Sequence, residues 1–140
     1  MGNAIDMFKT LRVAAAGMKV QSQRLRVIGE NIANASSTAQ SPGGEPYRRK
    51  MITFENVLDR KLGITTVRVA NYTYDKAEFG KRYDPTHPAA GDDGFVLLPN
   101  VNALIEMADM REALRSYEAN LSVVEASKSM LQKTIDLLSR

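Results

Sequence analysis

Residues 102–138 read NALIEMADMREALRSYEANLSVVEASKSMLQKTIDLL. Apolar side chains return here at alternating steps of three and four residues, from Met107 to Leu138, and Lys128 is the only polar member of the row. This spacing places them along one side of an α-helix. The stretch therefore predicts a helix of about 36 residues, which is about 54 Å long at a rise of about 1.5 Å per residue.

The first part of the chain repeats this pattern between Asn3 and about Asn34. Its apolar row spans residues 8–32 and alternates large side chains with mostly small ones. Gly17 and Gly29 are each unfavourable by about 1 kcal/mol in a helix interior. They indicate either the close approach of a neighbouring backbone or a local bend. An antiparallel or near-parallel pair of helices is the simplest way to bury both rows.

The segment between the two predicted helices has a different composition. Residues 35–46 (ASSTAQSPGGEP) are rich in Ser, Gly and Pro and predict a loop or extended linker. From Tyr47 onward the helical period is lost, and Thr, Val, Ile and Tyr favour short strands. Residues 55–62 fit either one helical turn or the start of a strand hairpin.

The predicted fold class is mainly α with a small β insert, in which the long N- and C-terminal helices pair as a coiled-coil-like unit. We expect residues 1–34 and 100–140 to form a terminal helical assembly domain. Residues 35–46 are then a linker, and residues 47–99 are a small β-rich insert with short strands.

Each predicted helix carries a second apolar stripe at seven-residue spacing, on the face opposite the main row in the first helix and on a flank of it in the last. Val13, Val20 and Val27 form one, and Val123, Met130 and Leu137 form the other. A lone pair of helices would leave these stripes in water, so they predict further partner helices and make the terminal helices assembly surfaces. The expected interface residues are Leu11, Val13, Met18, Val20, Leu25, Val27, Asn31, Ile32, Asn34, Leu114, Tyr117, Asn120, Leu121, Val123, Val124, Met130, Leu131 and Ile135.

Asn31 and Asn34 have two interpretations at this stage. Asparagine tolerates the left-handed backbone conformation that often ends a helix. Alternatively, their side chains form hydrogen bonds between neighbouring subunits. The sequence leaves both interpretations open.

The composition argues against catalysis. The 140 residues carry a net charge of +3, include no Cys and have one His. His87 lies near Asp84 and Asp92, so an acid-base pair or metal site is conceivable, but a turn around two prolines is the simpler interpretation. There is no Gly-rich phosphate loop before a helix and no GxSxG. We expect no enzyme activity, no cofactor and no metal.

Two further partner classes receive little support. Lys9, Arg12, Lys19, Arg24 and Arg26 could meet phosphates, but no dense basic region or aromatic platform is present. No apolar run is long enough for a membrane span. We therefore expect no nucleic acid and no direct membrane insertion, and no cleaved signal peptide at the N-terminal residues.

Several motifs together resemble one family. The segment Gln21–Asn34, which ends in Asn-Ile-Ala-Asn, resembles the N-terminal signature of bacterial flagellar rod and hook proteins, and Tyr47–Lys50 fits it. The motifs at Tyr83–Pro88 and Pro99–Asn102, with Glu106-Met-Ala-Asp-Met, are similar to those of the proximal rod within that family. The resemblance covers about residues 1–54 and 83–138.

This resemblance implies a structural subunit of the proximal rod of the flagellar basal body, which transmits torque from motor to hook and lines the export channel. It implies export through the flagellar type III apparatus to the periplasmic rod, with no peptide cleaved. The implied partners are other rod proteins, the adaptor that joins the rod to the membrane ring, and further copies in a helical assembly. The alternatives are another rod- or hook-type axial protein or a helical nucleic-acid-binding protein.

Overall fold

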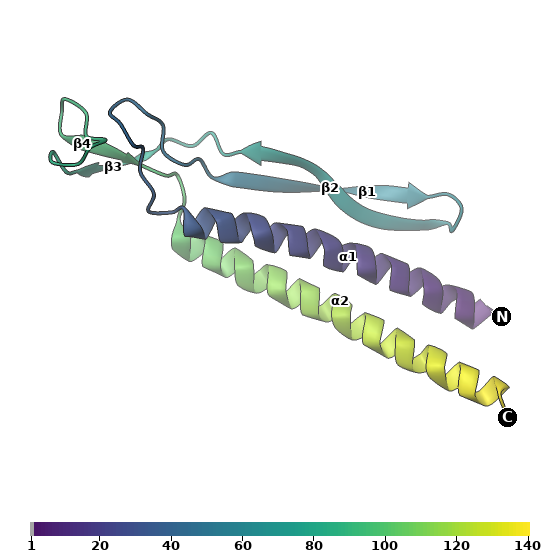
Figure 1. Ribbon diagram of the computed structural model, residues 1–140. Coiled ribbons are helices and arrows are strands. Elements are labelled where there is room, and N and C mark those ends of the chain that lie inside the picture. Colours follow the sequence, from purple (N-terminus) through teal and green to yellow (C-terminus); the bar gives the residue numbers. More distant parts are fainter. Residues whose placement is uncertain (1) are drawn as a thin grey trace. The chain divides into compact units, whose positions relative to one another are not determined.

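The chain begins and ends with a long helix, and the four strands lie between these helices in the sequence (Figure 1). The structure is a computed structural model and describes residues 2–140. The elements are α1 (Gly2–Ala33), β1 (Lys50–Asp59), β2 (Ile64–Tyr74), β3 (Gly80–Tyr83), β4 (Phe95–Leu98) and α2 (Ala103–Leu138). The predicted fold class, mainly α with a small β insert, is confirmed.

The strands form two separate two-stranded sheets, β1-β2 and β3-β4. Strand β1 continues to Asp59, whose carbonyl accepts a hydrogen bond from the Gly63 N–H at 2.8 Å. Gly63 has a φ of 64°, a conformation that glycine adopts without strain. Residues 55–62 are therefore the end of a strand and a hairpin turn, which settles the alternative that the sequence left open.

The second sheet is antiparallel and pairs Gly80 with Leu98 and Tyr83 with Phe95. The Tyr83 and Phe95 rings meet edge to face with their centroids 5.4 Å apart. Gly94 precedes this pair with a φ of 79°, and a Cβ there would lie 2.8 Å from the Tyr83 ring. Only glycine fits this turn.

The chain divides into two compact units. The first unit holds the residues up to Leu25, residues 53–71 and the residues from Arg111 onward. The second unit holds residues 26–52 and 72–110. Each unit contains a part of both helices and a part of the β1-β2 hairpin, and the β3-β4 sheet lies in the second.

In the first unit α1 and α2 run antiparallel and approach closely. A Cβ on Gly17 would lie 2.8 Å from the Asn120 side-chain nitrogen. Two turns further on, Arg24 forms an ion pair with Glu112 at 3.6 Å. Ala14 and Ala113 are buried between the helices. Gly17 therefore serves close packing rather than a bend.

Gly17 and Gly29 provide a matched pair of substitutions. We expect Gly29→Ala to raise the free energy of unfolding by about 0.5–1 kcal/mol, because alanine favours the helix and a Cβ there meets nothing within 4 Å. Gly17→Ala should raise the free energy of unfolding by clearly less, because the Asn120 side chain must move to make room for the added Cβ. Urea denaturation followed by circular dichroism measures both values, and an equal gain at the two sites would contradict the close approach.

Some of the residues of α2 that contact α1 are shifted by one position in the sequence from the predicted apolar row. The positions turned toward α1 are Ala113, Asn120 and Ser127, whereas Leu114 and Leu121 are exposed. The apolar row was predicted to be the intramolecular seam, and that expectation is wrong for these leucines. Small side chains let the two backbones approach, so the helices pack through them and leave the larger side chains on the flank.

The second stripe of α1 is also placed differently from the expectation. Val20 and Val27 are each 3% exposed, so they are buried within the chain, and only Val13 of this stripe is exposed. In the first unit Val67 and Val69 of β2 lie next to Ala16 and Val20. The expectation that further helices cover Val20 is therefore wrong, because a strand of the same chain covers it.

Candidate assembly interface

The two helices of the first unit share an exposed apolar face. Leu114 and Leu121 follow the contact positions of α2 by one residue, which turns them about 100° to one side of the contact. On α1, Gly17 and Arg24 face α2, and Met18 and Leu25 each follow one of them by one residue. Leu11 lies seven residues before Met18, on the same side of α1. In an antiparallel pair both sets lie on the same side. We call these five residues the open face.

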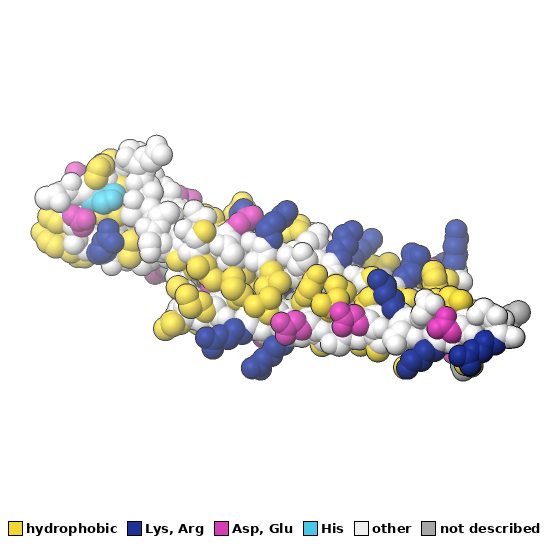
Figure 2. Space-filling model, turned by 60° about the horizontal axis from the view of Figure 1, so that its bottom comes forward, with side chains coloured by type: hydrophobic (Ala, Val, Ile, Leu, Met, Phe, Trp, Pro, Cys, Tyr) yellow, Lys and Arg dark blue, Asp and Glu magenta, His cyan; other side chains and the backbone are white. Residues whose placement is uncertain are grey.

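The open face is partly solvent-exposed in the single chain. Leu114 is 42% and Leu121 is 36% exposed, while Leu11, Met18 and Leu25 are half-buried. Figure 2 shows a row of apolar side chains along the helices, with charged side chains on either side of it. An aligned set of large apolar residues on a surface is typical of a protein contact.

The opposite side of the same helix pair is hollowed. One cavity is lined by Lys9, Thr10, Val13 and Val123, and also by Ile64 of the β hairpin. A second cavity shares Thr10 and Val123 and continues past Met7 to Met130 and Lys133. We call the two together the groove. Its walls are mostly apolar, and Val123 and Met130 are exposed.

The structure distributes the predicted interface residues over three environments. The exposed ones are Val13, Leu114, Leu121, Val123, Met130 and Ile135. The half-buried ones are Leu11, Met18, Leu25, Ile32, Asn34, Tyr117, Asn120, Val124 and Leu131. Val20, Val27 and Asn31 are buried within the chain, so their side chains are not free for a partner.

Asn31 lies at the centre of a polar cluster in the second unit. Its Oδ1 accepts hydrogen bonds from the Tyr47 hydroxyl at 2.7 Å and the Lys50 N–H at 2.9 Å. Its Nδ2 donates to the Lys50 carbonyl at 2.9 Å and to Glu106 Oε2 at 3.3 Å. The amide thus pairs with the first residue of β1 as a neighbouring strand would. The interpretation of Asn31 as a contact between subunits is wrong.

Glu106 and Arg49 form the charged part of this cluster. The Glu106 side chain is 1% exposed and accepts a hydrogen bond from Arg49 Nε. Asp75 lies 3.5 Å and Asp109 3.9 Å from the same guanidinium. Partial burial acts to lower the pKa of Arg49, but the hydrogen bond that Arg49 donates to Glu106 and the three nearby carboxylates outweigh it and raise this pKa. Arg49 therefore stays charged and neutralises the buried carboxylate.

Asn34 takes part in the end of α1 through its side chain. Its Nδ2 donates a hydrogen bond to the Glu30 carbonyl at 2.9 Å. Among residues 2–140 no residue other than glycine has a positive φ. The left-handed helix end expected for Asn31 or Asn34 is therefore wrong. The side-chain amide instead adds a second hydrogen bond to the Glu30 carbonyl, which also accepts one from the Asn34 N–H at 3.1 Å.

His87 joins two loops of the second unit. Its Nδ1 accepts a hydrogen bond from the Ala89 N–H at 3.0 Å, so the ring proton of the neutral form lies on Nε2, 3.3 Å from the Thr38 hydroxyl. Among residues 2–140 no group of three or more His, Cys, Asp or Glu side chains is placed to hold a metal ion. The ring is half-buried, so the turn around it is less solvated than the sequence suggested.

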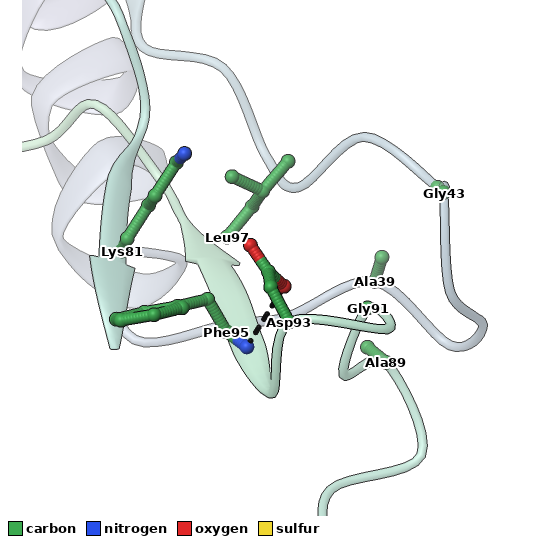
Figure 3. Close-up of a pocket in the computed structure, with 9 residues that line it drawn as sticks. Ala39, Gly43, Lys81, Ala89, Gly91, Asp93, Phe95 and Leu97 are labelled. Atoms are coloured by element: carbon green, nitrogen blue, oxygen red, sulfur yellow. Dashed lines mark hydrogen bonds between the residues drawn. The ribbon is translucent and has the colours of Figure 1, made fainter. Parts of the chain in front are cut away.

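A cavity of about 170 Å³ lies between these loops and the β3-β4 sheet (Figure 3). Its lining includes Gly43, Gly91 and Leu97, with Lys81 and Asp93 as the charged members. The Asp93 carboxylate accepts a hydrogen bond from the Phe95 N–H at 3.2 Å, which holds it to the turn. The cavity results from small loop residues and brings together none of the predicted site residues.

An ion pair between Lys50 and Glu30 lies beside the polar cluster. Lys50 Nζ donates to Glu30 Oε2 at 2.8 Å, which lowers the pKa of Glu30 and raises the pKa of Lys50. A lowered carboxyl pKa contributes stability that is lost as the pH falls through it. A raised ammonium pKa contributes stability that is lost as the pH rises through it. The pair therefore stabilises the fold across neutral pH.

We expect Lys50→Met to raise the pKa of Glu30 toward its ordinary value, because the hydrogen bond from Lys50 is the largest cause of the shift. Arg26→Met is the matched control, because Arg26 lies 3.9 Å from the same carboxylate and is a lesser cause. The measurement is an NMR titration of the Glu30 carboxyl carbon. A rise as large in the Arg26 variant would contradict this assignment.

The fold defines a structural helix-pair protein with apolar surfaces on both sides of α2. In the described part of the chain, no helix is both long and apolar enough to span a membrane. Two families match its ends. The family described as flagella basal body rod protein matches residues 11–39, and that described as flagellar basal body rod FlgEFG protein C-terminal matches residues 92–137.

Whole-chain relatives narrow this class further. The chain is 52% identical to the flagellar basal-body rod protein FlgC of Agrobacterium fabrum, covering 91% of each chain. It is 39% identical to that of Salmonella typhimurium, covering 89% of this chain and 92% of the relative. The chain is 37% identical to the FlgC of Bacillus subtilis, covering 93% of this chain and 97% of the relative.

The chain belongs to the FlgC family of flagellar basal-body rod proteins. It is a structural subunit of the bacterial flagellar basal body and associates with other components of the rod. The resemblance found in the sequence is therefore confirmed. The family is a structural one.

Proposed function

We propose that this subunit builds the proximal rod through its two terminal helices, which pack against neighbouring subunits around the export channel. The observation that carries the proposal is the pair of apolar surfaces on α2. Leu114 and Leu121 are exposed on one side of the contact with α1, and Val123 and Met130 are exposed on the other. A subunit with neighbours on both sides needs two such surfaces.

The finer parts of the proposal extend family membership to this chain. Its partners are other rod proteins, the adaptor between rod and membrane ring, and the flagellar type III export apparatus, which delivers it to the periplasm without cleavage. Residues 1–34 and 100–140 form the assembly domain, and residues 47–99 form an insert joined to it by the linker 35–46. Closely packed helices resist bending and twisting, which suits a shaft that transmits torque.

The exposed ends of the helices suggest that folding of the termini is completed during assembly. Leu137 and Leu138 are 72% and 83% exposed, so the last turns bury little apolar surface in the single chain. We expect a dilute monomer to show less helix by circular dichroism than the 32 residues of α1 and 36 of α2. Full helicity of a monomer, with its mass checked by light scattering, would contradict this.

The proposal is tested by deleting the gene in its source organism and examining purified basal bodies by electron microscopy. We expect membrane rings without a completed rod or hook, and restoration of the rod and of swimming by the cloned gene. Matched cells that carry the empty vector are the control. Normal flagella in the deletion strain would overturn the proposal unless a second copy of the gene is present, which genome sequencing decides.

A further inference from the structure

The linker, residues 35–46, is joined to the β3-β4 sheet and its loop by very few polar contacts. Among residues 2–140, a single hydrogen bond connects the linker with residues 80–98, and it joins Thr38 Oγ1 to His87 Nε2 at 3.3 Å. The other hydrogen bonds of the linker are made within itself or to the end of α1. The polar attachment of the linker to the sheet therefore depends on His87.

The cavity of about 170 Å³ lies between the linker and the sheet (Figure 3). Ala39 and Gly43 of the linker line it together with Ala89 of the loop and Leu97 of β4. Protein interiors normally leave few spaces of this kind, so the two parts of the chain are not packed tightly against each other here. A segment with few buried contacts opens at a low free energy.

Both ring nitrogens of His87 form contacts, and only the neutral ring can form them together. Nδ1 accepts a hydrogen bond from the Ala89 N–H at 3.0 Å, and Nε2 carries the proton that faces Thr38. A protonated ring carries hydrogen on both nitrogens, so its Nδ1–H would point at the Ala89 N–H. Ala89 is 8% exposed, so water replaces the lost acceptor only if the turn opens. The charged ring therefore has to leave the turn, and this takes Nε2 away from Thr38.

No counter-charge holds a protonated His87 in its present place. Within residues 2–140, no carboxylate oxygen lies within 4.0 Å of either ring nitrogen. The Asp84 carboxylate accepts a hydrogen bond from the Thr86 hydroxyl at 3.1 Å and lies 3.8 Å from Arg82. A half-buried positive ring without a partner is unfavourable. Glu45 is the ionisable residue of the linker, and those of residues 80–98 besides His87 are Lys81, Arg82, Tyr83, Asp84, Asp92 and Asp93.

We propose that His87 is a pH-sensitive switch that holds the linker over the β3-β4 sheet when its ring is neutral and releases the linker when its ring is protonated. The closed form needs the neutral ring, so a falling pH favours the open form. Histidine is the side chain that ordinarily changes its charge between about pH 5 and 8. Release exposes the walls of the cavity at Ala89 and Leu97.

The test is hydrogen exchange of the purified full chain, measured by mass spectrometry at about pH 7.5 and about pH 5, on either side of the usual histidine titration. Exchange of the unfolded chain at each pH corrects for the effect of pH on the chemistry itself. We expect the protection of residues 35–46 and 87–90 to fall about fivefold at the lower pH, which corresponds to the loss of about one hydrogen bond. Residues 53–71, which belong to the first unit, should keep their protection.

Two variants separate the ring from its partner in the linker. His87→Asn keeps an acceptor for the N–H two residues on but takes up no proton, so its linker protection should be the same at both pH values. Thr38→Val removes the hydroxyl and keeps the shape of the side chain. Its linker should be as poorly protected at about pH 7.5 as that of the unmodified chain at about pH 5. Ser36→Ala is the matched control, because Ser36 is exposed in the same linker, and it should behave as the unmodified chain does.

Equal linker protection at the two pH values in the unmodified chain would overturn the proposal. A fall in protection that persists in His87→Asn, or that extends equally to residues 53–71, would also overturn it, because either result reflects acid unfolding rather than His87. If circular dichroism shows that His87→Asn does not fold, Thr38→Val decides the question. Full linker protection of that variant at about pH 7.5 would show that the contact with His87 does not hold the linker.

Discussion

Arg49→Met is expected to lower the free energy of unfolding by about 3–5 kcal/mol, the usual range when one partner of a buried ion pair is removed. The guanidinium of Arg49 is the cation that meets the buried carboxylate of Glu106. Methionine has a similar length but no charge, so the carboxylate would keep only the Asn31 amide as a partner. A buried charge without a counterion is strongly unfavourable.

The loss should be measured by urea denaturation followed by circular dichroism. Arg82→Met is the matched control, because Arg82 is half-exposed and pairs with Asp84 at 3.8 Å near the surface. We expect that control to change the free energy by less than about 1 kcal/mol. Equal losses in the two variants would mean that the buried ion pair contributes no more to stability than the ion pair near the surface. Glu106→Gln should cost less than Arg49→Met, since Arg49 keeps Asp75 and Asp109.

The position of this cluster explains why it should matter for the fold. Asn31 and Glu106 come from α1 and α2, Tyr47 comes just before β1, and Lys50 is the first residue of β1. Asn100 adds a further link, because it accepts a hydrogen bond from the Arg49 N–H at 2.7 Å and donates to the Asp75 carbonyl at 3.0 Å. The cluster therefore fixes the ends of both helices to the strands of the second unit.

The sequence predicted the helices well because their apolar residues recur with the helical period over many turns. Both helices end within two residues of the expected limits. The strands were predicted from Thr, Val, Ile and Tyr, and the Gly63 turn decided the ambiguous residues 55–62. Local preferences are sufficient for elements of this kind.

The choice of contact face could not be predicted from the period alone. A row of apolar residues is the same whether it meets a helix, a strand or another subunit. Ala113 and Asn120 face α1 because their small or slender side chains let the backbone of α1 approach closely at Gly17. The residues of α2 that contact α1 are therefore one position earlier in the sequence than Leu114 and Leu121. The covering of Val20 by β2 depends on tertiary packing, which the stripe itself does not encode.

The buried polar cluster was missed for a related reason. Its members are separated by up to 75 positions in the sequence, and Glu106 was considered only as a part of a family motif. One signal was available, since Glu106 is an acidic residue close to the start of an otherwise apolar row, but its partner could not be identified. Buried polar partners are found by geometry rather than by spacing.

Leu121→Asp is expected to abolish swimming while the subunit itself stays folded. Leu121 is 36% exposed in the single chain, so the substitution should lower the free energy of unfolding by only about 1–2 kcal/mol, through lost apolar burial and weaker helix propensity. In an assembled rod the same carboxylate would be buried in an apolar contact without a partner. That cost is several kcal/mol, which is enough to prevent incorporation.

The measurement combines three readouts on cells that carry the variant gene in the deletion strain. Swimming on soft agar and rods in purified basal bodies should both be lost, and the purified chain should still unfold cooperatively in urea, with a midpoint only modestly below that of the unmodified protein. Ser122→Asp is the matched control, because it adds the same charge at an exposed neighbouring position off the open face, and it should leave swimming intact. Leu131→Asp should also block incorporation, but with a larger loss of stability, because Leu131 is half-buried in the chain itself. Normal swimming with Leu121→Asp would show that the open face meets no neighbour in the rod.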